Sequence, residues 1–175
     1  MARGARAAQE PASGGRHREH TQDVQVLRHS NRFDWIFIDT PPLDMDVIEN
    51  AVVVADCVIV PVRTSSLDIG SIDALVEMCR DHHKPFKFLL SAVDAKFKKL
   101  TATALSALVE DGDVFGTRVS YRLPYINAMT AGKVGPEIDK ELKPEVDALW
   151  SEVQALAVSA FKPSLKAVKG RAAND

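Results

Sequence analysis

The chain has 175 residues, of which 46% are hydrophobic and 26% charged, and its formal net charge is −2. This is enough sequence for one domain with an apolar core, and the composition excludes wholesale disorder, collagen and coiled coil. The longest apolar stretch, residues 51–62, is too short for a membrane span, and no apolar stretch follows the first arginines as a secretion signal requires. We therefore expect a cytoplasmic protein without a membrane partner.

The chain divides by composition into three parts. Residues 1–32 are rich in Ala, Arg, Gly and His, and their pattern predicts a loose basic arm. Residues 33–161 are expected to form an α/β domain, and residues 162–175 a basic tail. Each end carries a net charge of +3, which leaves −8 on the central part. Basic ends can contact polyanions such as DNA, but solvated tails of this kind are common, and both interpretations stay open.

The predicted elements of the central part begin with a short apolar run from Trp35 to Asp39. Aromatic and β-branched residues fill it and Thr40-Pro41-Pro42 closes it, which predicts a buried strand followed by a loop. A helix-compatible segment over 45–55 comes next. Residues 57–62 are a second continuous apolar run, typical of a strand that is covered on both faces.

The following segments continue the alternation of strand and helix. From Asp68 to Cys79 apolar residues recur at intervals of three and four, which predicts an amphipathic helix. Residues 86–93 predict a third strand, residues 100–109 another helix, and residues 114–120 a fourth strand candidate.

The last predicted element is a helix over 142–161, which Pro144 can open from its first turn and which we expect to dock through its Trp150 side. Strands that alternate with amphipathic helices imply right-handed βαβ crossovers. The predicted fold class is therefore α/β, with a mostly parallel sheet and helices on both faces. In such sheets ligands bind beyond the carboxyl ends of the strands. Cys57 and Cys79 lie inside apolar patterns and are expected to be buried free thiols.

Asp39 is the residue with the clearest chemical signal. It ends an apolar strand and precedes two prolines. In nucleotide-binding α/β folds such a carboxylate holds Mg²⁺ through water, and the loop after it senses the terminal phosphate. The alternative is that Asp39 only caps the turn that follows. Lysines at positions 96, 98 and 99 follow the third strand and fit either an anion site or a solvated helix start.

The stretch from residue 33 to about 156 resembles the ParA/MinD family of deviant P-loop ATPases, and particularly its small ParA-type partition proteins. The segment FDWIFIDTPP resembles the family's Walker B strand and switch loop, ADCVIVPVRTSSLDIGSI its next strand and helix, and FKFLLSAVD the strand after that. RLPYINAMTAGKVGPE resembles a late segment of the family. The resemblance implies a P-loop NTPase-like fold and a role in plasmid or chromosome partition.

The resemblance also implies site residues and partners. The residues expected at the nucleotide are Asp39, Thr40, Pro41, Pro42, Ser91 and Arg122, and Asp39 is also the expected magnesium residue, through water. The residues expected to contact DNA without sequence preference are Lys162, Lys166, Lys169 and Arg171. A complete relative binds Mg-ATP, dimerises over it, coats DNA and is stimulated by a centromere-binding partner. Nonspecific DNA, such a partner and a second copy are therefore the expected partners.

The 175 residues depart from the family at the phosphate-binding site, so the resemblance is to a member truncated at its amino-terminal end. Neither G-x-x-x-x-G-K-(S/T) nor the family's K-G-G-x-G-K-(S/T) occurs, and the single Gly-Lys pair, Gly132-Lys133, is followed by Val134. Without those N–H groups and the loop lysine little holds the β- and γ-phosphates. We therefore expect this chain alone to bind no Mg-ATP. Ser91 stands where relatives often place Asn against the adenine.

The family's P-loop strand would lie between the strands predicted at 35–39 and 57–62, so its absence leaves a gap. Either these strands pair directly, or a partner fills the space, or the chain is a fragment that folds poorly. Three functional hypotheses follow from the resemblance and the missing phosphate-binding segment. They are a ParA-like partition ATPase domain that cannot bind or hydrolyse ATP alone, a non-catalytic protein- or DNA-binding module of the same fold, and a non-functional fragment.

Overall fold

The computed structural model describes the backbone of residues 17–30, 32–42 and 44–171, and the side chains of this range from residue 23 to residue 160. The chain comprises two compact units, Met1–Val54 and Ala55–Asp175. None of the helices in the described ranges is long and apolar enough to cross a bilayer.

The described residues of the first unit form the helices α1 (His17–His29) and α2 (Met45–Val54). α2 buries Val52 and Val54, and Arg28 of α1 donates a hydrogen bond from Nη2 to the carbonyl oxygen of Val54 at 2.7 Å. The sequence predicted a loose basic arm over residues 1–32, and the structure shows a helix over the part of it that α1 covers. The helix is so polar that no apolar stripe marks it.

The segment between α1 and α2 is not the buried strand that the sequence predicted. Residues 33–42 form no strand, and Phe37 is 68% exposed. The rings of Trp35 and Phe37 stack on each other with centroids 6.4 Å apart. A strand must exchange backbone hydrogen bonds with a neighbour, and no strand in the described part of the chain pairs with this segment. Direct pairing of residues 35–39 with the next strand is therefore not observed.

The second unit is built on a two-stranded parallel sheet. β1 (Val58–Val62) and β2 (Phe86–Leu90) pair from one end to the other, with Val58 opposite Phe86. Both strands are continuous apolar runs of the kind that the sequence analysis identified. Val60 and Val62 of β1 and residues 88–90 of β2 are buried, as expected for covered strands, whereas Pro61 of β1 is exposed.

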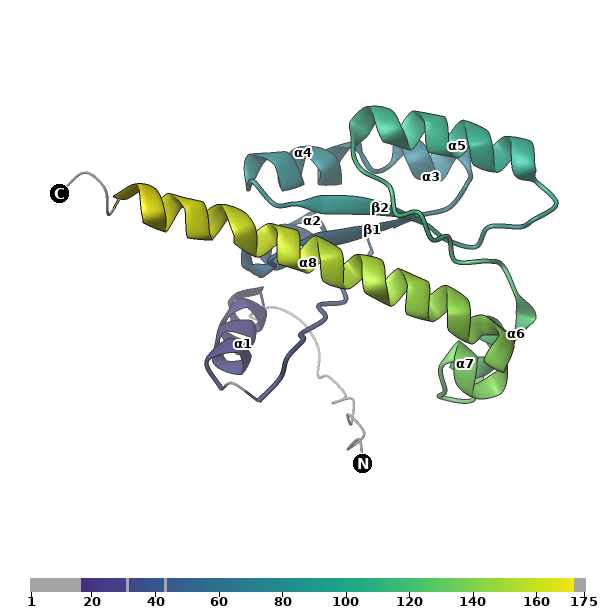
Figure 1. Cartoon of the computed structure of the whole chain (residues 1–175), viewed down its shortest axis with the longest axis horizontal. Coiled ribbons are helices and arrows are strands. Elements are labelled where there is room, and N and C mark those ends of the chain that lie inside the picture. The colour runs from purple at the N-terminus through teal and green to yellow at the C-terminus, as the bar shows by residue number, and fades with distance from the viewer. Residues whose placement is uncertain (1–16, 31, 43, 172–175) are drawn as a thin grey trace. The chain divides into compact units, whose positions relative to one another are not determined.

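Helices cover both faces of this sheet (Figure 1). On one side lie α3 (Ser66–Gly70), α4 (Asp73–Asp81) and α5 (Lys98–Asp111), and along the other side runs α8 (Lys143–Arg171). β1 and β2 are thus joined by a crossover that carries helices. The predicted α/β fold class is confirmed.

Two apolar clusters join these layers. The cluster beneath α4 and α5 contains Val60, Val62, Ile72, Val76, Phe88, Leu90, Ala104 and Leu108. The cluster between the sheet and α8 contains Leu89, Phe115, Val153 and Leu156. The sequence predicted that α8 docks through its Trp150 side, but Trp150 remains 36% exposed. It lies at the edge of the docked face, which is centred on Val153 and Leu156.

Two predicted elements differ in detail from the structure. The helix predicted after β1 is divided into α3 and α4, and Gly70 and Ser71, which have low helix propensity, stand at the division. Residues 114–120 form isolated parallel bridges at Val114 and Ser120 rather than a strand. The chain still follows β2 closely enough to extend one edge of the sheet.

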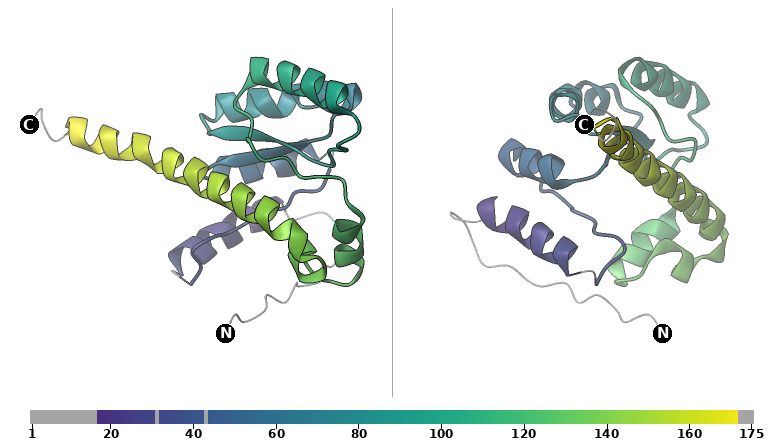
Figure 2. Two further views of the ribbon diagram at one scale, coloured as in Figure 1. Left: turned by 45° about the vertical axis from the view of Figure 1, so that its right-hand side comes forward. Right: turned by 60° about the vertical axis from the view of Figure 1, so that its left-hand side comes forward.

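A small helical hairpin that the sequence analysis did not predict precedes α8. It consists of α6 (Leu123–Thr130), α7 (Gly135–Ile138) and a 3₁₀ turn (Lys140–Leu142), and it lies at the amino-terminal end of α8 (Figure 2). Pro124 lies in the first turn of α6, and Gly132, whose φ is 63°, lies in the turn between α6 and α7. These two residues are the signals from which the hairpin could have been predicted.

The two cysteines are free thiols, as the sequence predicted. Cys79 is buried, and burial raises the pKa of its thiol to about 11. Cys57 is half-buried, and burial raises the pKa of its thiol as well, with a further contribution from the charge of Asp56. Because the thiolate is the reactive form, both side chains are poor nucleophiles at neutral pH.

Candidate functional site

The carboxyl end of β2 and the segment that pairs beside it bring two of the predicted site residues to one edge of the sheet. Ser91 follows β2 directly, and its N–H donates to the carbonyl oxygen of Val62 at 2.9 Å. Two residues later, the carbonyl oxygen of Val93 accepts a hydrogen bond from the N–H of Tyr121 at 2.9 Å. Arg122 comes next in the chain and begins α6 as its N-cap residue. Ser91 and Arg122, both expected at a nucleotide, therefore leave the sheet at the same edge.

The loop after β2 contains backbone strain at this edge. Ala92 has a φ of 52°, in the left-handed region that favours glycine. A non-glycine residue in that conformation costs roughly 1–2 kcal/mol. Strain of this kind occurs preferentially at functional sites and is maintained by surrounding hydrogen bonds, here those of Ser91 and Val93.

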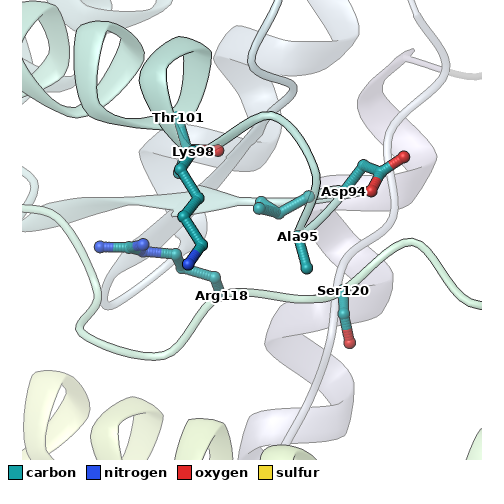
Figure 3. Close-up of a pocket in the computed structure, with 7 residues that line it drawn as sticks. Asp94, Ala95, Lys98, Thr101, Arg118 and Ser120 are labelled. Atoms are coloured by element: carbon teal, nitrogen blue, oxygen red, sulfur yellow. The ribbon is translucent and has the colours of Figure 1, made fainter.

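A pocket of about 430 Å³ lies beside this edge (Figure 3). Its lining residues are Val93, Asp94, Ala95, Lys98, Thr101, Arg118 and Ser120. Neither Lys98 nor Arg118 forms an ion pair within the described part of the chain. The carboxylate of Asp94 accepts a hydrogen bond from the N–H of Lys96 at 2.9 Å, and Figure 3 shows it directed away from the two cations.

The start of α5 adds to the positive character of this pocket. Its N-cap residue, Phe97, gives no side-chain hydrogen bond, and its first turn contains no acidic residue. The unsatisfied N–H groups of that turn and the positive end of the helix dipole act together with Lys98 and Arg118. These groups give the pocket a positive potential on the side where Lys98 and Arg118 lie.

The sequence singled out Lys98 as part of a lysine cluster but missed Arg118. Pairing of residues 114–120 with β2 and the loop after it, through the bridge at Ser120 and the hydrogen bond from the N–H of Val119 to the carbonyl oxygen of Leu90, brings Arg118 close to the start of α5. The available signal was its position near the end of the fourth strand candidate.

A glutamate of α8 holds the segment that carries Arg118. The carboxylate of Glu152 accepts hydrogen bonds from the N–H of Gly116 at 2.7 Å and from the N–H of Thr117 at 2.8 Å. Burial alone would raise the pKa of Glu152, but the hydrogen bonds from Thr117 and Gly116, together with the charge of Lys87, outweigh it and lower this pKa. Glu152 is therefore ionised at neutral pH and fixes the segment as a charged acceptor.

A second glutamate of α8 connects the sheet edge to α6. The carboxylate of Glu145 accepts hydrogen bonds from the N–H of Ser120 at 3.2 Å, from the hydroxyl of Ser120 and from the hydroxyl of Tyr125 at 2.6 Å. Burial and the hydrogen bond to Glu145 raise the pKa of the Tyr125 hydroxyl. Tyr125 thus stays a neutral donor that holds the first turn of α6 against α8.

The other predicted nucleotide residues lie in the first unit. Asp39, Pro41 and Pro42 are exposed, and Thr40 is half-buried. An exposed carboxylate fits a magnesium contact through water. The alternative, that Asp39 only caps the turn that follows, stays open; at the start of α2 the carboxylate of Asp44 accepts a hydrogen bond from the N–H of Val47 at 3.3 Å.

No group of three or more His, Cys, Asp and Glu side chains gathers in a metal-binding arrangement in the ranges that the structure describes. The magnesium role of Asp39 and a site that joins it to Ser91 and Arg122 stay predictions. The predicted DNA contacts stay predictions too. α8 continues to Arg171, but the side chains of Lys162, Lys166, Lys169 and Arg171 lie outside the described residues.

Residues 15–91 of the chain match the family model of an AAA domain. Over this range the chain is therefore similar to a P-loop NTPase-like domain, and the range includes the segment 33–42 and both strands of the sheet. The late segment that contains Arg122 lies beyond it. No curated protein matches the chain significantly.

Proposed function

We propose that this chain is the carboxyl-terminal portion of a ParA-like partition ATPase and that it does not bind Mg-ATP by itself. The observation that carries the proposal is the segment FDWIFIDTPP, which lies inside the range similar to a P-loop NTPase-like domain. Its resemblance to the Walker B strand and switch loop of the ParA/MinD family favours partition over other activities of that class.

In this function each predicted residue would contact a different part of the bound nucleotide. With a phosphate cradle present, Asp39 would hold Mg²⁺ through water and the loop Thr40-Pro41-Pro42 would sense the terminal phosphate. Ser91 would take the position that relatives often fill with Asn against the adenine, and Arg122 would contact the nucleotide. The exposure of Asp39 and the common sheet edge of Ser91 and Arg122 are compatible with these roles. The phosphate cradle must come from another segment, because the 175 residues contain no P-loop motif.

Calorimetric titration with Mg-ATP tests the proposal. We expect no binding by the 175-residue chain. A longer chain that begins with an in-frame K-G-G-x-G-K-(S/T) segment, read from the DNA before Met1, is expected to bind, and Asp39→Ala in it to weaken magnesium-dependent binding. Tight binding by the present chain alone would refute the proposal. An upstream DNA without such a segment would favour the non-catalytic binding module instead.

Nonspecific DNA is the partner that the charge distribution favours within this proposal. Lys162, Lys166 and Lys169 follow one another at intervals of four and three in the last part of α8. A mobility shift that weakens steeply with salt is the expected result, since phosphate contacts release counterions. Replacing Lys166 and Lys169 by Ala should weaken the shift, whereas the same change at Lys140 and Lys143 should leave it unaltered. Absence of any shift at low salt would remove DNA from the proposal.

A further inference from the structure

α6 exposes three large apolar side chains, together with the polar side chains of Asn127 and Thr130. Leu123, Ile126 and Met129 recur at intervals of three residues and are 65%, 45% and 82% exposed; we refer to these three side chains as the α6 face. Tyr121 and Val134, just before and just after α6, are exposed as well. Monomeric soluble proteins rarely expose contiguous apolar surface, and where they do it usually marks an interaction site.

The opposite side of α6 is fixed to the rest of the second unit. Ala128 is buried, and the hydroxyl of Tyr125 donates to Glu145 at 2.6 Å. α7 approaches so closely that a Cβ atom at Gly135 would lie 2.7 Å from the ring of Tyr125. α6 therefore cannot turn its apolar side inward without breaking these contacts, and the α6 face is presented in one orientation. A binding surface that is already ordered loses little entropy when it binds.

The charges beside the α6 face are positive. Arg122 precedes α6 and Lys133 follows it, both are exposed, and neither forms an ion pair with any residue that the structure describes. The next carboxylate along the chain, Glu137, accepts the N–H of Val134 at 2.8 Å and closes the first turn of α7. An apolar strip with a cation at each end complements an apolar segment with acidic ends.

A second copy of this chain fits the α6 face poorly. A symmetric contact between two antiparallel α6 helices would bring Arg122 of one copy toward Lys133 of the other, so that like charges meet at both ends. Like charges across an interface disfavour it. A partner of the opposite charge pattern has no such penalty.

We propose that the α6 face docks an amphipathic helix of a partner protein whose apolar anchors are flanked by acidic residues. α6 has eight residues and is about 12 Å long, so two to three turns of a partner helix cover it. An interface of this size belongs to the weak and transient class. The inference goes beyond the proposed function, because the docking requires no nucleotide.

Fluorescence anisotropy with a designed peptide tests the proposal on the full chain. The probe is a labelled helical peptide of about 15 residues with Leu at intervals of three and four and Glu at both ends. Its control is the same peptide with Lys in place of each Glu. We expect the Glu-flanked peptide to bind at least about tenfold more tightly than the Lys-flanked one. Lys133→Glu should weaken binding of the Glu-flanked peptide and strengthen binding of the other.

Substitutions on α6 and a matched substitution elsewhere locate the binding surface. Ile126→Ser combined with Met129→Ser should weaken the Glu-flanked peptide by about tenfold or more. The control is Val109→Ser on α5, which removes an apolar side chain that is 64% exposed, and it should leave binding unchanged. Because Met129 is largely exposed, Met129→Ser alone keeps the fold. In the unaltered protein labelled at its methionine methyl groups, the peptide should shift the NMR signal of Met129 and not that of Met78.

Several results would overturn the proposal. One is that the Glu-flanked peptide fails to bind, and another is that both peptides bind alike. A third is that Val109→Ser weakens binding as much as the α6 substitutions do. The last such result would come from light scattering. If the unaltered protein is a dimer and Met129→Ser dissociates it, the occupant of the α6 face is a second copy of the chain.

Discussion

Glu152 connects α8 to the segment that carries Arg118 through two backbone N–H groups, at 2.7 and 2.8 Å. Glu152→Gln removes the charge from this acceptor and should lower the free energy of unfolding at pH 7 by about 1–2 kcal/mol. Because the folded pKa of Glu152 lies below its ordinary value of 4.5, the carboxylate contributes fully above pH 4.5, and this stability is lost as the pH falls through the folded pKa. Urea unfolding at neutral and acidic pH should show the difference between the two proteins shrinking in acid. A difference that is the same at both pH values would contradict this role.

Ala92 is the residue at which backbone strain can be measured directly. Its φ of 52° suits glycine, so Ala92→Gly should raise the free energy of unfolding by about 0.5–1 kcal/mol, after the larger entropy of an unfolded glycine is allowed for. Ala102→Gly, at an exposed position inside α5, is the matched control and should lower it by about 1 kcal/mol. Thermal or urea unfolding of both variants decides the matter. If Ala92→Gly and Ala102→Gly lower the free energy of unfolding by the same amount, the conformation at Ala92 carries no strain.

At the scale of the element, α8 stabilises the second unit through one narrow face. Leu156 on that face is buried in the cluster with Leu89 and Phe115, whereas Val158, two residues later, is exposed. Leu156→Ala should lower the free energy of unfolding by about 2–4 kcal/mol, and Val158→Ala by less than about 0.5 kcal/mol. Urea denaturation of the two variants measures the contrast. Equal effects would show that α8 docks through a different face.

The elements that the sequence predicted well are those whose signal is local. β1 and β2 are continuous apolar runs, and α4, α5 and α8 carry apolar stripes that the core uses. α1 and α6 escaped prediction because α1 is mostly polar, with Val24, Val26 and Leu27 as its apolar residues, and α6 is short. The strand expected at residues 35–39 failed for a different reason, since strand formation depends on a partner and no described strand supplies one.

The candidate site shows the same limit. Ser91 and Arg122 could be placed at one sheet edge from the alternation of strands and helices, because parallel strands end at the same edge. The meeting of Lys98 with Arg118 could not, because it depends on the isolated bridge at Ser120 rather than on spacing in the chain. Long-range pairing of this kind leaves no periodic signal in a sequence.

At the scale of the whole molecule, the sequence and the structure place the start of the folded domain differently. Composition predicts a start at residue 33, whereas the chain divides between Val54 and Ala55. Both apolar clusters belong to the second unit. A chain of residues 55–175 should therefore unfold cooperatively on its own, with a Tm within a few degrees of that of the full chain.

Circular dichroism melts of residues 55–175, of residues 33–175 and of the full chain test this expectation. If residues 33–175 melt cooperatively and residues 55–175 do not, the boundary predicted from composition is right and the segment 33–42 supports the fold. If the two shorter chains melt alike, that segment adds nothing to stability. Its exposed aromatic residues and Asp39 would then have to be explained by binding, because selection for folding alone gives no reason to keep Phe37 in contact with water.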